Sequence, residues 1–116
     1  MKFFTITSFL IATCATLAAQ TTADKANLDN GKNLFAKYGC YQCHGYVGQG
    51  GLAGARLAQT RLTLIAFTTY VRNPRPGGMP PFRAKLVSDK ELADVYAYIK
   101  TFPEPPAVKD VPLLNQ

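Results

Sequence analysis

One short run of residues constrains this chain more than any other: Cys40-Tyr41-Gln42-Cys43-His44. Two thiols separated by two residues can each add across a vinyl group of one porphyrin. The imidazole that follows is then held beneath the ring, where it can bind the iron, so the run is typical of a c-type haem attachment site. The sequence therefore predicts one haem c, attached covalently through Cys40 and Cys43, with His44 as an axial ligand.

Two other kinds of site use the same cysteine spacing. A thioredoxin-like redox dithiol needs a preceding strand and a longer α/β chain around it, and the sequence indicates neither. A closed zinc site needs four protein ligands, but His44 is the only histidine and Cys14 the only further cysteine. Haem attachment fits the run better than either alternative.

Residues 1–19 have the layout of a secretory signal peptide. Lys2 is followed by an apolar run that ends in small residues at Ala18-Ala19. We expect export and cleavage after Ala19. An uncleaved anchor helix is a second interpretation, although the run is short for a bilayer span. A lipoprotein signal ending at Cys14 is a third, and Thr13 just before that cysteine weakens it.

The remainder divides into a short linker at 20–26, one haem domain at 27–102 and a proline-rich tail at 103–116. A chain of 116 residues favours a single domain. A core this small usually depends on a disulfide, a metal or a partner for stability. Without the leader only Cys40 and Cys43 remain, both used by the haem, so we expect the haem rather than a disulfide to complete the core.

Helical periodicity occurs in three segments, separated by loops. The first is 29–39, the second 63–72, and the third begins at a capping-box pattern formed by Ser88 and Glu91 and ends before Pro103. Five glycines between 45 and 59 predict a loop. The residues expected to face inward are Leu34, Phe35 and Tyr38 in the first helix, Ile65, Phe67, Tyr70 and Val71 in the second, and Leu92, Val95, Tyr96 and Ile99 in the third.

A second informative stretch is the proline- and glycine-rich segment 73–82, which contains Met79. Met79 is the only methionine besides Met1. Pro80 pushes the backbone of Met79 toward an extended conformation, so the thioether can project from a stiff loop. We predict Met79 as the second axial ligand of the iron, where a sulfur opposite an imidazole would favour the reduced state. The alternative is a methionine that fills a gap in the packing.

These features together resemble the class I cytochromes c, the small one-haem electron carriers, over about residues 27–102. The resemblance rests on the haem motif, on Met79 in its loop and on the run Asp94-Val95-Tyr96-Ala97-Tyr98-Ile99-Lys100. It implies an all-α fold, a bundle of three to four short helices wrapped around one covalently attached haem. It also implies a close crossing of the first and last helices, with Gly31 and Phe35 meeting Val95 and Tyr98.

The resemblance assigns roles to the segment Gly54-Ala55-Arg56-Leu57. In the family, a Gly-Pro-x-Leu stretch supplies a backbone carbonyl that orients the axial histidine and a leucine that covers the porphyrin. Leu57 is accordingly the expected covering residue. Ala55 replaces the usual proline, which removes the rigidity of that turn but leaves the carbonyl.

The function that the resemblance implies is periplasmic single-electron carriage rather than catalysis. With His44 and Met79 both bound, the iron would have no open position for a substrate. The expected partners are redox proteins, for example a periplasmic dehydrogenase as donor and a terminal oxidase or another cytochrome as acceptor. The alternative is a peroxidase-like haem enzyme or a gas-binding protein, in which Met79 does not hold the sixth position.

The charge distribution bears on the partner. The formal net charge is +6, and no Asp or Glu occurs between Asp29 and Asp89. A positive field around the haem would favour a partner with an acidic docking surface; otherwise one or two arginines neutralise the haem propionates and the rest are solvated. We expect no nucleic-acid binding from an exported haem protein and no stable membrane insertion after leader cleavage. The basic residues of this span are Lys32, Lys37, Arg56, Arg61, Arg72, Arg75, Arg83 and Lys85.

Overall fold

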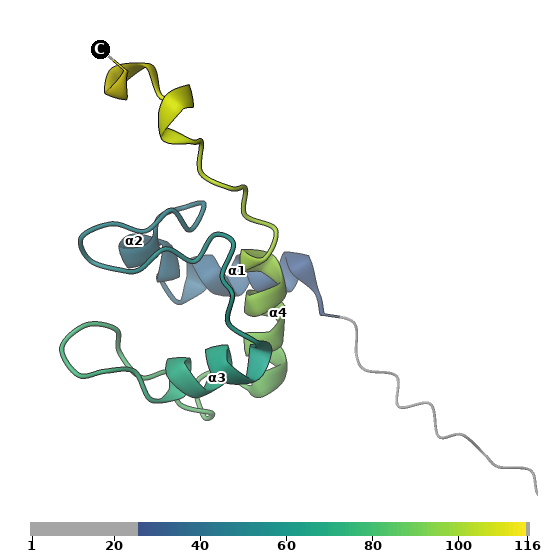
Figure 1. Ribbon diagram of the computed structural model, residues 1–116. Helices are drawn as coiled ribbons and strands as arrows, with labels where there is room; N and C mark the ends of the chain where they lie inside the picture. Colours follow the sequence, from purple (N-terminus) through teal and green to yellow (C-terminus); the bar gives the residue numbers. More distant parts are fainter. Residues whose placement is uncertain (1–25, 116) are drawn as a thin grey trace, which may run out of the picture.

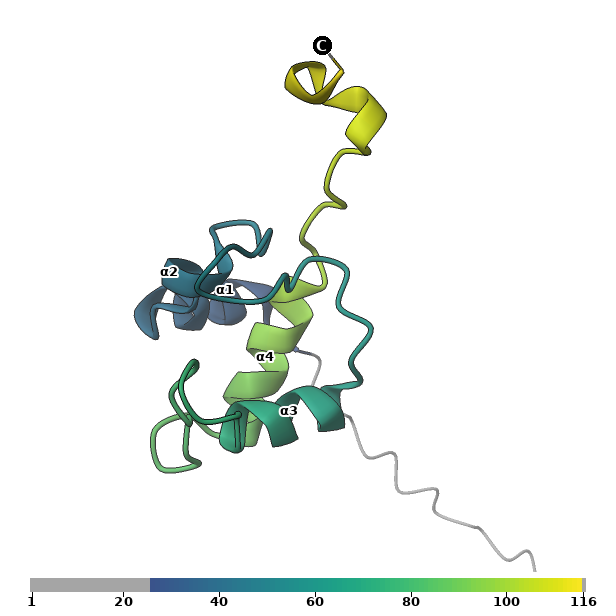
Figure 2. The same ribbon diagram turned by 60° about the vertical axis from the view of Figure 1, so that its left-hand side comes forward.

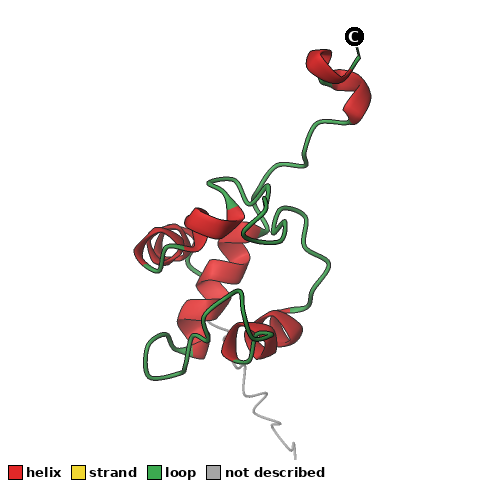
Figure 3. Cartoon of the chain, turned by 90° about the vertical axis from the view of Figure 1, so that its left-hand side faces the viewer, coloured by secondary structure: helices red, strands yellow, loops and turns green. Residues whose placement is uncertain are grey.

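The computed structural model describes residues 26–115, and this part of the chain is all-helical (Figures 1 and 3). Its α-helices are α1 (Leu28–Lys37), α2 (Cys40–His44), α3 (Leu64–Arg72) and α4 (Asp89–Ile99). Two short 3-10 helices, η1 (Val108–Asp110) and η2 (Pro112–Leu114), follow in the tail. Residues 26–115 contain no strand. The all-α fold predicted from the sequence is confirmed.

Side-chain caps fix where the longer helices begin. The Asn27 side chain accepts a hydrogen bond from the backbone N–H of Asn30 at the start of α1, and Thr63 does the same for α3. At α4 the predicted capping box is present: Glu91 N–H donates to Ser88 Oγ over 3.2 Å, and Ser88 N–H donates to Glu91 Oε2 over 2.7 Å. Each cap satisfies amides that the helix itself cannot pair.

The crossing of α1 and α4 forms the centre of the bundle (Figures 1 and 2). A Cβ atom at Gly31 would collide with the backbone carbonyl of Asp94 and would lie 2.9 Å from the Cβ of Tyr98. The Phe35 ring packs edge-on against Tyr98, with ring centroids 5.7 Å apart. Tyr98 is therefore confirmed as a partner of both Gly31 and Phe35, while the close approach to Asp94 was not predicted. Val95 is buried.

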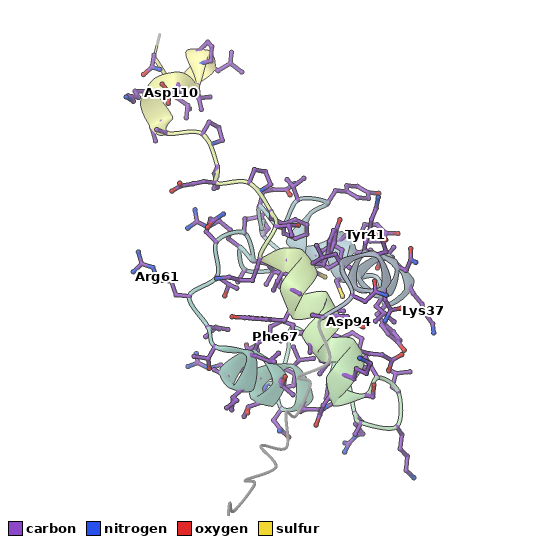
Figure 4. The ribbon with its side chains drawn as sticks, turned by 90° about the vertical axis from the view of Figure 1, so that its right-hand side faces the viewer. Lys37, Tyr41, Arg61, Phe67, Asp94 and Asp110 are labelled. Atoms are coloured by element: carbon purple, nitrogen blue, oxygen red, sulfur yellow. The ribbon has the colours of Figure 1, made fainter. Side chains whose placement is uncertain are left out.

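A buried carboxylate reinforces this crossing. Asp94 is 2% exposed and accepts hydrogen bonds from the backbone N–H of Asn27 over 2.7 Å and from Asn30 Nδ2 over 2.8 Å. Burial alone would raise the pKa of Asp94, but the hydrogen bonds from Asn30 and Asn27, with the charge of Lys90, bring it below its usual value. Figure 4 shows Asp94 on the side of α4 that meets α1. Asp94 thus ties the start of α1 to the middle of α4.

Helix α3 contacts α4 through a narrower face than the sequence predicted. Phe67 and Val71 are buried, and the Phe67 ring lies between α3 and α4 (Figure 4), 5.5 Å from the ring of Tyr96. The prediction for Ile65 was wrong, because its side chain is 79% exposed. Tyr70 is 46% exposed, but it lines both cavities of the candidate site, as an inward-facing residue should. Residues four apart share one face of a helix, and only the face of Phe67 and Val71 meets α4.

The tail leaves the bundle instead of lying along it (Figures 1 and 2). Its two short helices pack on each other, and Asn115 Nδ2 donates to the backbone carbonyl of Lys109 over 2.7 Å. The predicted leader, 1–19, and nearly all of the predicted linker, 20–26, lie outside the described residues. Within 26–115, no helix has the length and apolar character needed to cross a membrane.

Candidate haem site

The Cys-x-x-Cys-His run forms helix α2, a single turn bounded by two glycines. Gly39 before it and Gly45 after it have φ values of 68° and 80°, in the left-handed region that favours glycine. Residues three apart lie on the same side of a helix, so this turn presents Cys40 and Cys43 together. Both are free cysteines; Cys40 is half-buried and Cys43 exposed.

The electrostatics of Cys40 differ from those of a redox dithiol. Burial raises the pKa of the Cys40 thiol above its usual range, and the neighbouring Cys43 adds to this. Thioredoxin-like cysteines have lowered pKa values, because the thiolate is their reactive form. In addition, no strand precedes the motif within residues 26–115. Neither feature of a thioredoxin-like site is present here.

The imidazole of His44 is oriented by a backbone carbonyl. Its Nδ1 lies 2.6 Å from the carbonyl oxygen of Ala55. A carbonyl only accepts, so Nδ1 carries the proton and Nε2 keeps the lone pair that can bind a metal. A Cβ at Gly54 would lie 2.7 Å from the carbonyl oxygen of Cys43 and 3.0 Å from His44 Nδ1, so the glycine allows this close approach. The contact expected from the segment 54–57 is found.

The site opens into two adjoining cavities of about 340 Å³ and 330 Å³. Cys40, His44 and Met79 line both. Of the other residues predicted for the site, Leu57 lines the larger cavity and Cys43 the smaller one. The remaining lining of the larger cavity is mostly apolar side chains from α1, α3, α4 and the intervening loops, including Phe35, Phe67, Val71, Leu92, Val95 and Ile99.

Met79 reaches these cavities from the loop between α3 and α4. Its side chain is half-buried, whereas Gly78 before it and Pro80 after it are exposed. The loop thus exposes the backbone on either side of Met79 and turns the Met79 side chain inward. The structure brings the imidazole of His44 and the thioether of Met79 to the same cavities, although they are far apart in the sequence.

A sequence model of one known family matches residues 26–99 of the chain. The family is described as cytochrome c oxidase, cbb3-type, subunit III. The chain belongs to this family. Its matched part is a c-type cytochrome domain similar to those of class I. No curated protein and no solved structure matches the chain.

The residues of the cytochrome domain fit the haem c that such a domain carries. The attachment chemistry needs two thiols and one imidazole in the order found at α2. The porphyrin needs a predominantly apolar space, which the side chains around the larger cavity provide. The iron needs nitrogen or sulfur donors, and His44 and Met79 both line that cavity. A cytochrome domain of this kind carries electrons through its haem.

Three aromatic residues line both cavities and were not identified as site residues from the sequence: Tyr38, Tyr70 and Phe82. Tyr38 and Phe82 line both cavities, with ring centroids 5.8 Å apart and an angle of 73° between the rings. Tyr38 also donates from its hydroxyl to the carbonyl of Leu86 over 2.7 Å. Tyr38 and Tyr70 were expected only to face inward. The position of Phe82 three residues after Met79, in the same loop, is the signal that could have identified it.

Proposed function

We propose that this cytochrome is a periplasmic single-electron carrier, with one haem c bound through Cys40 and Cys43 and with His44 and Met79 as axial ligands. One observation supports this most strongly: an imidazole with its Nδ1 tied to Ala55, and a half-buried thioether, border the same apolar cavities. An imidazole and a thioether together are the ligand set of cytochromes c, and the thioether raises the potential.

The haem supplies the redox chemistry, and the chain supplies position and environment. Cys40 and Cys43 would hold the cofactor, each thiol adding across one vinyl group to form a thioether. The carbonyl of Ala55 fixes the ring plane and the tautomer of His44, which also makes the imidazole a stronger donor. Leu57 and the aromatic side chains around the cavity exclude water from the porphyrin face. With His44 and Met79 as protein ligands, the iron would keep no site for a substrate.

Charge supports a redox partner with an acidic surface. Arg75 and Arg83, on either side of Met79, are exposed, and Arg56 lines the larger cavity. Arg61 extends away from the bundle (Figure 4). Positive charge around the site would steer an acidic partner toward it. We therefore propose that the partner docks at the surface that carries these arginines, called the basic face below. A periplasmic dehydrogenase as donor and a terminal oxidase or another cytochrome as acceptor fit the proposal.

Absorption spectra of the reduced and oxidised protein, with and without carbon monoxide, test the ligation. The protein should be low-spin, show a sulfur-to-iron band when oxidised and bind carbon monoxide only slowly. Met79→Ala should lose the band and bind carbon monoxide quickly. Met79→His is the matched control, because it removes the sulfur but leaves a sixth ligand, so it should lose the band and still resist carbon monoxide. Rapid binding by the unaltered protein would instead favour the gas-binding or peroxidase-like alternative.

Export has its own test. Mass spectrometry of protein isolated from the periplasm should find a chain that starts near Gln20 and carries one haem. A chain that retains Met1 would contradict cleavage of the leader. A chain that begins at Cys14 with added lipid would support the lipoprotein interpretation.

A further inference from the structure

One arginine connects three elements around the loop that carries Met79. Arg72, the last residue of α3, donates from Nη1 to the backbone carbonyl of Phe82 over 2.6 Å. Its Nη2 donates over 2.6 Å to Oδ1 of Asp89, the first residue of α4. The Arg72 side chain is 14% exposed and that of Asp89 81% exposed. The guanidinium therefore lies mostly inside the structure and ties the returning part of the loop to both helices.

The position of Phe82 determines how far Met79 can move. Pro80 and Pro81 have no backbone N–H, so Phe82 is the first residue after Met79 that can donate a backbone hydrogen bond. It does so to the carbonyl of Val71 over 3.0 Å. Three residues span at most about 11 Å, and the two prolines stiffen the connection. The position of Met79 therefore depends mainly on where Phe82 is held.

On the other side of Met79 the loop is less constrained. Gly77 and Gly78 are exposed, and a Cβ atom at either position would have no neighbour within 4 Å. The loop tip is therefore open, and contacts at its base must hold the thioether in place. Three contacts hold the base of the loop, all of them at Phe82. Its backbone N–H donates to the carbonyl of Val71, its ring packs on Tyr38, and its carbonyl accepts from the guanidinium of Arg72.

We propose that Arg72 is a positioning residue for the sixth ligand: its guanidinium, bound to the Phe82 carbonyl and to Asp89, keeps Met79 on the iron. The inference rests on the proposed ligation by Met79. It assigns to this arginine a role apart from the basic face, because its charge is already paired with Asp89. When the guanidinium is removed, the loop is released at Phe82, and states in which the thioether has left the iron become more populated.

The two contacts of Arg72 should contribute unequally. The contact with Phe82 is partly buried, and a charged donor bound to a carbonyl there is among the stronger hydrogen bonds. The contact with Asp89 is an ion pair whose carboxylate is largely in water, where such pairs contribute little. Asp89→Asn should therefore have a small effect, while Arg72→Gln should have a large one. Arg72→Lys keeps the charge but lacks the planar fork that reaches both acceptors, and should resemble Arg72→Gln.

The test measures how fast carbon monoxide binds to the reduced, haem-loaded protein, well below its unfolding temperature. Carbon monoxide binds only when Met79 is off the iron, so the rate reports the population of that state. Loss of one charge-assisted hydrogen bond predicts a rate about tenfold higher or more in Arg72→Gln. Asp89→Asn should change the rate less than about threefold. Lys85→Gln removes the same charge from an exposed position of the same loop, and should leave the rate and the sulfur-to-iron band unchanged.

A double variant separates positioning from general stability. In the Met79→Ala background the thioether is gone, so adding Arg72→Gln should not raise the rate further. If Arg72→Gln lowers the unfolding temperature but leaves the rate and the band as in the unaltered protein, Arg72 only supports the fold and the proposal is wrong. If the unaltered protein itself lacks the band and binds carbon monoxide rapidly, the proposed ligation has failed instead, and this is visible before any variant is made.

Discussion

Gly31 of α1 lies so close to the backbone carbonyl of Asp94 in α4 that any side chain at position 31 would collide with it. The same residue of α4 reaches back with its carboxylate to the first turn of α1. One close backbone approach and one buried carboxylate therefore fix how the first and last helices cross. The crossing positions Phe35 and Val95, which line the haem cavity.

Substitution of Gly31 by alanine should destabilise the haem-loaded protein. Alanine favours a helix over glycine by about 1 kcal/mol, but the collision with the Asp94 carbonyl would force the helices apart, at a cost of about 1–3 kcal/mol or more. A collision this close belongs at the upper end of that range, so we expect the free energy of unfolding, measured with denaturant, to fall by about 2 kcal/mol net. Gly51→Ala is the control, because a Cβ there has no neighbour within 4 Å. If the two variants were equally stable, α1 and α4 would cross less closely in solution than the structure shows.

Asp94→Asn should destabilise the protein at neutral pH by about 1–2 kcal/mol, since one charge-assisted hydrogen bond from Asn27 or Asn30 is lost. The hydrogen bonds lower the pKa of Asp94 in the folded protein below its unfolded value, which is about 3.9. The stabilisation is therefore complete above the unfolded pKa and is lost as the pH falls through the folded one. The stability difference between wild type and Asp94→Asn should be constant above about pH 5 and shrink below about pH 4.

That pH dependence should be specific to Asp94. Asp110→Asn, an exposed carboxylate in the tail (Figure 4), provides the comparison and should change stability little at any pH. Thermal unfolding of all three proteins across the pH range measures both effects. A difference between wild type and Asp94→Asn that grows toward low pH would contradict the assignment.

Gly54→Ala should raise the reduction potential of the haem. The added Cβ would meet the Cys43 carbonyl and His44 Nδ1 and displace the segment that holds the Ala55 carbonyl. An imidazole without this hydrogen bond is a weaker donor and stabilises oxidised iron less. Loss of one hydrogen bond, about 1 kcal/mol, corresponds to a shift on the order of 40 mV. Redox titration measures it, with Gly51→Ala as the unshifted control; a lower potential in Gly54→Ala would contradict the role of Ala55.

The rate of electron transfer to an anionic reagent should fall as salt is added, and the rate to a cationic reagent should rise. Between about 0.01 M and 0.15 M salt the screening length falls from about 30 Å to 8 Å. Oxidation by an anionic complex such as ferricyanide should slow several-fold over this range, and oxidation by a cationic cobalt complex should become faster. Arg75→Glu should slow the anionic reaction more than Lys109→Glu, which makes the same charge change in the tail. Rates independent of salt with both reagents would rule out steering by the basic face.

Local signals in the sequence were sufficient for most of the fold. The amphipathic patterns and caps placed the bounds of α1 and α3 within about two residues and the start of α4 within one, because a cap and an apolar stripe are properties of neighbouring residues. The predicted end of α4, just before Pro103, lies three residues beyond the observed end at Ile99. The spacing of Cys40, Cys43 and His44 indicated the cofactor for the same reason. The family resemblance added the contact between His44 and Ala55, which no local pattern would suggest.

Other features depend on partners far along the chain. Asp94 is buried because its hydrogen-bond donors lie 64 and 67 residues earlier, in the first turn of α1 and its cap. Ile65 is exposed because only a narrow face of α3 packs on α4. Helical periodicity shows which face of a helix is apolar, but it does not show how much of that face a neighbouring helix will cover. Arg72 was counted only as one of several basic residues, since its pairing with Phe82 and Asp89 requires the loop to return to α3.

The most direct measurement is the mass of the purified protein after it has been denatured and extracted with acidic organic solvent, which removes any haem that is not covalently bound. We predict a coloured polypeptide heavier than the chain by one haem, and a colourless product without haem from the variant in which Cys40 and Cys43 are both replaced by alanine. A colourless wild-type polypeptide with the mass of the chain alone would contradict covalent attachment at these cysteines, and with it the proposed electron carrier.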